Sequence, residues 1–508
     1  MTLCRAHQHG TVATAGAGAY RVARAAAEGS TMSHLPCSVR KSAPYVIALV
    51  ASLLMCSTAE ARPKKPDLKL KLEDRMLPLQ DACFPSGLRV VLQEDHTHPI
   101  VSMTTIIDGG FANDPPGQQG IAHLMEHLWF RSLHDGYPVN ATIEALGGRY
   151  NAWTSGDTIA FRTVAPTKAL DTLLTMEVAK LSDPLRGVDD AIVDIEREVV
   201  RNETKLGYRP LQDVVRARLY EALLPEGDPR ANLTHAKLDA IDHASLTAYT
   251  KERWRPAHTT LVVVGDMSVQ ELWTAVTTQL PFEILGDPER PSATTGTCAS
   301  RVGEPATVPE PRQKRPDPIR ATVDDRMIVT AWNLPGSWRE HDVLYEISAG
   351  VLAHFTSQRT GVPVHCQVWP GRQTAAMVCQ AVVKGPGQAV RVKRNLIATS
   401  KDLSVESAKP MLAETLELIY AGERRRLFES MDDVGGLDSG RGYMLASKLH
   451  HTASSTYVTD RVRSLHAMTV DGLSHVFSHD LHPSRMVVLD VEPVEASEES
   501  LSNGSESR

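Results

Sequence analysis

The residues His123-Leu124-Met125-Glu126-His127 bring two imidazoles and a carboxylate close together in the chain. In a helix, residues three and four positions apart lie on one face, so His123, Glu126 and His127 share a face. Imidazoles and carboxylates are typical ligands of zinc, and a catalytic zinc site keeps three protein ligands and one open position for water. The two histidines therefore need one further ligand from elsewhere in the chain.

Glu203 is the best candidate for that ligand. It ends the segment Asp194–Glu203, which is rich in helix-forming residues and has the apolar spacing of a helix. Glu196 lies on the same predicted face, so one carboxylate can bind the metal while the other orients a ligand. A helix rich in Glu and Arg is also typical of a solvated surface. The histidine motif favours the metal-binding interpretation.

The chain resembles the pitrilysin family of zinc metallopeptidases, which includes the mitochondrial processing peptidase and insulin-degrading enzyme. The resemblance runs from about residue 84 to about residue 493. It rests on four segments: Phe84–Leu92, Gly120–Phe130, Gly147–Thr154 and Glu196–Glu203. The resemblance implies that His123, His127 and Glu203 bind one zinc ion per chain, that Glu126 is the catalytic base, and that Glu196 is an accessory carboxylate of the catalytic site.

The segment Gly147–Thr154 resembles the strand at the active-site edge of that family. A substrate held in an extended conformation can add to an exposed strand through main-chain hydrogen bonds. Asn151, Ala152 and Thr154 are therefore the expected substrate-binding residues. Ordinary strand and turn chemistry after a Gly-Gly bend is the alternative interpretation of these residues.

The expected fold class is α+β, with two homologous α/β-sandwich halves of the processing-peptidase type joined by a linker. Each half begins with strands and a helix and closes with an apolar strand that follows a proline. The expected ranges are a catalytic zinc-binding domain at 78–285, an exposed proline-rich linker at 286–320, a second domain without metal at 321–494, and a disordered acidic, Ser-rich tail at 495–508.

The second half departs from the family pattern. It has no histidine-carboxylate motif, and Ser357 and Val364 occupy the places where family members usually supply an Arg and a Tyr that contact the substrate. Arg359 and His365 lie nearby. We expect Arg359 to be a surface residue and His365 to be a packed one.

The N-terminal extension, residues 1–61, contains a complete export signal. Arg40 and Lys41 precede the apolar run Tyr45–Met55, and Ala59-Glu60-Ala61 supplies a cleavage site. We expect translation to begin at Met32, with residues 32–61 as the signal and the mature protein in the periplasm or secreted. Lipidation at Cys56 is the one route to a membrane anchor that the sequence suggests. A net charge of −7 gives no basic footprint for nucleic acid.

Cleavage after Ala61 leaves four of the seven cysteines. In an oxidising compartment they are expected to pair as Cys366 with Cys379 and Cys83 with Cys298. Free buried thiols are the alternative.

Two functions fit these residues. The first is a secreted zinc endopeptidase or oligopeptidase that hydrolyses extended or unfolded peptides. The alternative is a weakly active or noncatalytic metal-binding subunit of a two-chain peptidase, so that the partner is a second copy or a related peptidase-like chain. Retention of Glu126 favours the enzyme, whereas Ser357 and Val364 favour the subunit.

The export signal yields the first testable prediction. N-terminal sequencing of the mature protein should begin at or near Arg62, because residues up to Ala61 are removed on export. Recovery of an intact Met1 or Met32 end from the cytosol would contradict both the compartment and the disulfide prediction.

Overall fold

The computed structural model describes residues 79–203, 208–232, 237–286, 300–303, 306–339, 341–437, 440–454 and 456–494. The predictions for the export signal, Met32, Cys56, Cys298 and the acidic tail lie outside these residues. Within the described ranges, no helix is both long enough and apolar enough to cross a membrane.

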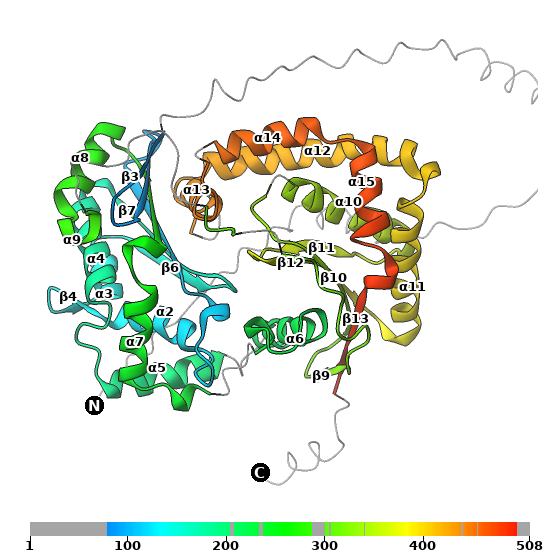
Figure 1. Ribbon diagram of the computed structural model, residues 1–508, viewed down its shortest axis with the longest axis horizontal. Helices are drawn as coiled ribbons and strands as arrows, with labels where there is room; N and C mark the ends of the chain where they lie inside the picture. The colour runs from blue at the N-terminus through cyan, green and yellow to red at the C-terminus, as the bar shows by residue number, and fades with distance from the viewer. Residues whose placement is uncertain are drawn as a thin grey trace, which may run out of the picture. The chain divides into compact units, whose positions relative to one another are not determined.

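The first sheet has six strands in the order β1-β2-β8-β3-β7-β6 (Figure 1). Its strands are β1 (Leu79–Cys83), β2 (Arg89–Glu94), β3 (Ile100–Asp108), β6 (Arg149–Thr154), β7 (Thr158–Pro166) and β8 (Thr259–Gly265). Neighbouring strands are antiparallel except β2 and β8, which are parallel. Every residue of β8 is buried, as expected for an apolar strand covered on both faces.

The helices of this half are interspersed with its strands along the chain. They are α2 (Ile121–Arg131), α3 (Val139–Ala145), α4 (Leu170–Ser182), α5 (Asp190–Glu203), α6 (Tyr208–Leu223), α7 (His243–Arg253), α8 (Val269–Gln279) and α9 (Phe282–Leu285). A small hairpin, β4 (Leu133–His134) and β5 (Tyr137–Pro138), joins α2 to α3. Short 3₁₀ turns lie at Phe111–Asn113, Thr167–Ala169, Pro229–Asn232, Leu238–Ala240 and Pro256–His258.

The second sheet has the order β11-β12-β10-β13-β9. Its strands are β9 (Ile319–Ala321), β10 (Arg326–Pro335), β11 (His365–Trp369), β12 (Thr374–Val383) and β13 (Val487–Pro493). Its helices are α10 (Asp342–Thr360), α11 (Gly385–Leu403), α12 (Lys409–Asp432), α13 (Arg441–Leu449), α14 (Tyr457–Ala467) and α15 (Val470–His479), with 3₁₀ turns at Glu406–Ala408 and Pro483–Arg485.

The two sheets share one topology. Reading from β6 and from β11, three antiparallel pairings are followed by a parallel one, β8 with β2 and β13 with β9. The predicted α+β class with a repeated architecture is therefore confirmed. The division into domains at 78–285 and 321–494 stays a prediction.

Each sheet is covered by its own helices on one face and by a helix from the other half on the opposite face (Figure 1). Leu445 and Leu449 of α13 pack with Val262 of the first sheet. Leu219 of α6 packs with Val329 of the second sheet. This exchange joins the halves through apolar cores on both sheets.

The predicted linker is not exposed throughout. Arg301 donates a hydrogen bond to Thr260 Oγ1 at 2.8 Å and another to the carbonyl of His450 at 3.1 Å. Val302 is buried, and β9 begins at Ile319, inside the predicted linker range. The exposed interpretation was wrong for these residues because apolar and charged side chains of the segment pack against the neighbouring strands.

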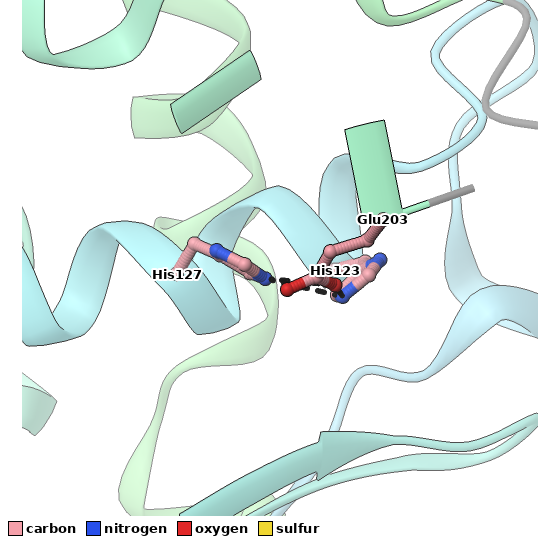
Figure 2. A group of neighbouring side chains, drawn as sticks. All are labelled: His123, His127 and Glu203. Carbon is pink, nitrogen blue, oxygen red and sulfur yellow. Dashed lines mark hydrogen bonds and ion pairs between the residues drawn. The ribbon is translucent and has the colours of Figure 1, made fainter. Parts of the chain in front are cut away.

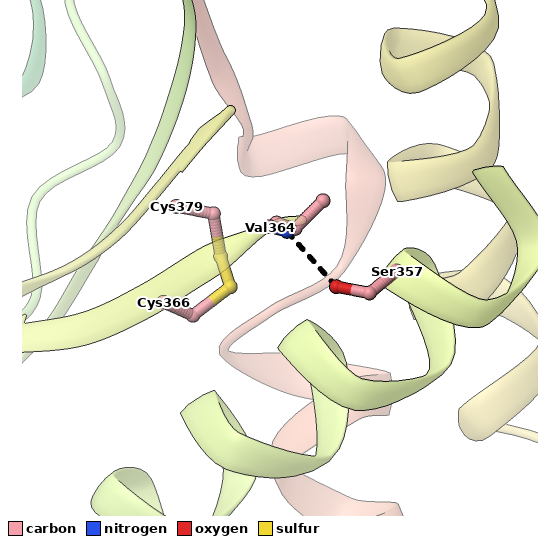
Figure 3. The surroundings of a disulfide bond; sticks show 4 residues. All are labelled: Ser357, Val364, Cys366 and Cys379. Atoms are coloured by element: carbon pink, nitrogen blue, oxygen red, sulfur yellow. Dashed lines mark hydrogen bonds between the residues drawn. A yellow bond between two sulfur atoms is a disulfide. The ribbon is translucent and has the colours of Figure 1, made fainter. Parts of the chain in front are cut away.

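The predicted disulfide between Cys366 and Cys379 is confirmed (Figure 3). The two residues are directly opposite each other in β11 and β12, with Cα atoms 4.0 Å apart. Cys83 is also disulfide-bonded.

The helix exchange predicts a strong effect of truncating Leu219. This side chain is 0% exposed, so Leu219→Ala should lower the free energy of unfolding by about 2–5 kcal/mol through lost burial and a residual cavity. Val214→Ala is the matched control on α6, because Val214 is 48% exposed and should change stability by less than about 0.5 kcal/mol. Chemical denaturation measures both, and equal effects would contradict the packing described for α6.

Candidate metal centre

The first turn of α2 is capped from outside the helix. Gly120 has a φ of 99°, a left-handed conformation that suits glycine. The Asp114 carboxylate accepts hydrogen bonds from the N–H groups of Gly120 at 2.7 Å and Ala122 at 3.2 Å. A carboxylate at this end satisfies free N–H groups and complements the helix dipole. The cap fixes the backbone immediately before His123.

Packing then sets the direction of the motif side chains. Leu124 and Met125 are fully buried in the core of the first half. His123 and His127 therefore lie on the opposite side of α2, next to the end of α5 (Figure 2). Glu203, the last residue of α5, points toward both imidazoles.

The three predicted ligands converge on one point. Nε2 of His123 and Nε2 of His127 are 3.3 Å apart, and Glu203 Oε2 lies 3.5 Å from the first and 3.6 Å from the second. Ligand atoms bound about 2.0–2.1 Å from a tetrahedral zinc ion lie roughly 3.3–3.4 Å from one another. The described residues contain no other group of three or more His, Cys, Asp or Glu side chains that could hold a metal. Two imidazoles and one carboxylate thus fit a zinc ion with an open position.

Glu196 contacts His127 on the side of the imidazole ring away from the other candidate ligands. Its Oε2 lies 3.1 Å from His127 Nδ1, and its Oε1 accepts a hydrogen bond from Arg131 Nε at 2.6 Å. In the neutral imidazole, a carboxylate at Nδ1 places the proton there and leaves Nε2 as an acceptor. Glu196 therefore contacts the candidate ligand His127 and does not join the three atoms that converge on the candidate zinc position.

The charges at the site favour binding of a cation. Hydrogen bonds from His123 and His127 hold the pKa of Glu203 well below its usual range. Burial opposes protonation of His127, but the hydrogen bonds with Glu196 and Glu203 outweigh it and raise the pKa to about 9. Because the pKa of His127 is raised, binding of a metal ion at its Nε2 would have to displace a proton.

Glu126 lies beside these residues without joining the three converging atoms. It is 8% exposed, and burial raises the pKa of its carboxyl group. Thr154 Oγ1 donates a hydrogen bond to Glu126 Oε2 at 2.6 Å, which links α2 to the end of β6. A raised carboxyl pKa suits a group that accepts and returns protons near neutral pH.

The metal-site cavity, about 710 Å³, contains all of the predicted site residues. Its lining includes the His123–His127 face of α2, both α5 carboxylates, and Asn151, Ala152 and Thr154 of β6. Among the described strands, β6 pairs only with β7. The other edge of β6 is therefore the edge of the first sheet and pairs with no described strand.

Several residues of this site were missed in the sequence. Arg131 is four residues after His127, so helical spacing could have identified it as a partner on the same face. Asp114 is separated from α2 by a loop. Arg216 of α6 and Tyr443 of α13 also line the cavity, and no local pattern brings these distant residues to it.

The second half offers no Arg or Tyr at the positions expected from the family. Ser357 Oγ accepts a hydrogen bond from the Val364 N–H at 2.9 Å, so these two residues contact each other (Figure 3). Arg359 forms an ion pair with Asp402 at 2.7 Å, in agreement with a surface role. The expectation of a packed His365 was wrong, because its side chain is exposed on the edge strand β11.

Comparison with known proteins finds a family match in the first half of the chain. Residues 89–228 match the family model described as insulinase (peptidase family M16). The chain carries an M16 peptidase domain. The predicted resemblance to pitrilysin-type peptidases is thus confirmed.

The curated relatives are similar over part of their length. The chain is 27% identical over 199 residues to the mitochondrial-processing peptidase subunit beta of Blastocladiella emersonii, which is 37% of this chain and 41% of that protein. It is 27% identical over 198 residues to a zinc protease of Mycobacterium leprae, which is 37% of this chain and 43% of the relative. The chain therefore spans about two fifths of the length of these relatives.

Solved structures share the fold over most of this chain. A protease from Helicobacter pylori has a TM-score of 0.66 at 15% identity and covers 82% of this chain and 100% of its own. An inactive M16 domain from Pseudomonas fluorescens has a TM-score of 0.62 at 15% identity and covers 83% and 100%. The first half of the periplasmic protease PqqL from Escherichia coli has a TM-score of 0.58 at 16% identity and covers 81% and 91%. Proteins described as proteases and a domain described as inactive thus share this fold.

The geometry predicts a graded loss of zinc affinity when the α5 carboxylates are changed. Glu196→Gln should weaken zinc binding about 10- to 100-fold because it disturbs the orientation of His127, and Glu203→Gln should weaken it further because it removes a ligand charge. Glu198→Gln is the matched control, since Glu198 lies on α5 but is exposed and pairs with Arg201. Competition with a chelator of known affinity measures each variant. Unchanged affinity in Glu203→Gln would remove that residue from the ligand set.

Proposed function

We propose that this chain is an exported zinc metallopeptidase that hydrolyses peptide bonds in extended or unfolded peptides. The observation that carries the proposal is the convergence of His123 Nε2, His127 Nε2 and Glu203 Oε2 at 3.3–3.6 Å beside the buried carboxyl group of Glu126. Relatives named as zinc proteases support the choice of metal.

The residues divide the chemistry between them. A bound zinc ion would lower the pKa of a water molecule to about 7 and polarise a carbonyl group. Glu126 takes the proton of the attacking water and later passes a proton to the leaving amine. Thr154 holds the Glu126 carboxylate in place through its 2.6 Å hydrogen bond, and Glu196 holds His127.

The open edge of β6 supports the choice of substrate. A peptide that adds to Asn151, Ala152 and Thr154 binds mainly through its backbone, so a wide range of sequences can be held in the same register. Most of the backbone of a folded protein is already paired in its own helices and sheets and cannot add to β6. The substrates are therefore unfolded proteins and peptides.

The proposed compartment is the periplasm or the exterior. The export signal in the sequence, the Cys366–Cys379 disulfide and the description of PqqL as a periplasmic protease support it. A partner chain is compatible with the proposal, since one relative is named as a subunit of a processing peptidase. That partner would be a second copy or a related peptidase-like chain.

A second candidate is a weakly active or noncatalytic metal-binding subunit of such a two-chain peptidase. The observation that favours it is the mutual contact of Ser357 and Val364, which leaves these positions without a side chain that could grip a substrate. A solved M16 domain described as inactive has the same fold. Glu126 argues against this function, because a scaffold does not need a buried carboxyl group beside its metal.

Replacement of Glu126 separates the two functions. Glu126→Gln should lower peptide turnover about 10²- to 10⁴-fold, the usual range for loss of a general base, while zinc content stays nearly unchanged. The assay uses a broad set of unfolded peptides, and Glu198→Gln serves as the active control. Turnover equal to wild type would show that the assigned base is wrong. If the wild-type protein cleaves no peptide, alone or with a candidate partner chain, the noncatalytic function is favoured.

A further inference from the structure

A second cavity lies on the opposite face of β6 from the metal. We call it the aromatic cavity; its volume is about 450 Å³, within the range of about 300–1,000 Å³ that is typical of ligand pockets. It shares Phe111, Trp153, Thr154, Arg216 and Tyr443 with the lining of the metal-site cavity. The two cavities therefore meet at the end of β6.

The side chains of β6 alternate between these two sides. Tyr150 and Ala152 pack against the core that contains α2, and Thr154 bonds to Glu126 on that side. Trp153 packs against the cluster formed with α13 on the other side and contacts Tyr443 edge-on, with ring centroids 4.7 Å apart. The aromatic cavity thus lies mainly on the α13 side of the first sheet, and it meets the metal-site cavity where Thr154 lines both.

A peptide that pairs with β6 continues the sheet and must follow the same alternation. If one of its side chains points toward the metal side of the sheet, the next side chain points toward the α13 side. On that side the aromatic cavity opens beside β6, lined by Ile106 and Ala160 of the sheet and by Ser447 of α13. A bound substrate therefore places every second side chain on the α13 side, and the one beside Trp153 and Thr154 lies next to this cavity.

The lining of the cavity is aromatic. Phe, Trp and Tyr make up 5% of the chain. The cavity nevertheless collects Trp153, Tyr220, Trp338, Tyr345, Trp369 and Tyr443. Tyr220 and Trp369 form an edge-on pair with centroids 6.0 Å apart, and the Arg216 guanidinium lies 5.7 Å from the Trp369 ring. Such surfaces bind flat aromatic rings and bulky apolar groups.

The acidic groups of the lining have partners within the protein. Asp157 accepts a hydrogen bond from the Arg372 N–H at 3.0 Å, and Asp342 accepts one from the Trp338 N–H at 2.6 Å. Glu346 forms an ion pair with Arg461. These three carboxylates are thus held by groups of the protein itself, and the aromatic faces provide the apolar contact surface of the cavity.

We propose that the aromatic cavity is a specificity subsite that binds one aromatic or bulky apolar side chain of a peptide paired with β6. The proposal rests on the proposed function, because it requires a peptide on that strand. It adds a substrate preference that the metal centre alone does not supply. Peptides with such a residue at the alternate position should bind and be cleaved better than peptides with alanine there.

The test compares matched peptides with the full-length mature protein. A host peptide of small polar residues carries a single Phe or Ala, which is moved along the sequence one position at a time. Dissociation constants are measured by calorimetry on the zinc-loaded Glu126→Gln protein, where turnover is suppressed, and kcat/KM is measured on the active protein. At one position, Phe should improve binding and kcat/KM about 10-fold or more over Ala.

Two variants assign the preference to this cavity. Trp369→Ala removes an aromatic wall, and Ser447→Phe fills the space. The Ser447 hydroxyl bonds only to the Met444 carbonyl of its own helix, so the second substitution breaks no contact between elements. Both should reduce the Phe preference to about twofold or less. Phe282→Ala, which truncates an aromatic residue that is 64% exposed and outside the cavity, should leave it unchanged.

The binding measurements test the subsite, and the cleavage measurements test the proposed catalytic function. A Phe preference in binding that is lost in both variants supports the subsite even if no peptide is cleaved, and in that case only the proposed catalytic function fails. Cleavage without a Phe preference overturns the subsite and leaves the proposed function standing. Equal binding of all peptides, absence of binding, or a preference that survives both variants also overturns the subsite.

Discussion

The packing of α5 against α2 is the constraint on which the candidate centre depends. Two imidazoles and a carboxylate are brought to 3.3–3.6 Å from one another in a partly buried place. Such a group is costly unless each member has a charge or hydrogen-bond partner. The Glu196 contacts to His127 and Arg131 supply one part of that compensation, and the ion pairs of Glu203 with both histidines supply another. The positions of the three candidate ligands thus depend on how α5 packs against α2.

The exchange of helices extends this constraint to the second half. α6 leads from the end of the metal-binding helix α5 to the second sheet, while α13 returns to cover the first sheet. Arg216 and Tyr443, one from each of these helices, line the metal-site cavity. The second half thus shapes the cavity beside the candidate metal site, although Ser357 and Val364 offer no Arg or Tyr side chain and are hydrogen-bonded to each other. The absence of the family's Arg and Tyr at positions 357 and 364 therefore does not prevent the second half from lining the cavity.

Local patterns account for the parts of the fold and site that were predicted from the sequence. The 3.6-residue period places His123, Glu126 and His127 on one face, and the same period unites Glu196 with Glu203. The Cys366–Cys379 disulfide could be predicted because the two residues lie on neighbouring segments with the sequence pattern of strands. Contacts between distant residues could not be predicted from the sequence, because no local pattern brings Tyr443 to β6 or Arg301 to Thr260. The prediction that His365 is packed was wrong because the sequence does not show which face of the edge strand β11 is exposed to solvent.

The central claim is that His123, His127 and Glu203 hold one zinc ion at an open catalytic site. X-ray absorption spectroscopy at the zinc edge of the purified, zinc-loaded protein tests it most directly. The account predicts nitrogen and oxygen ligands at about 2.0–2.1 Å, an imidazole signature from two histidines, and the loss of one imidazole in His127→Gln. A sulfur ligand at about 2.3 Å, or an imidazole signature that His127→Gln leaves intact, would contradict it.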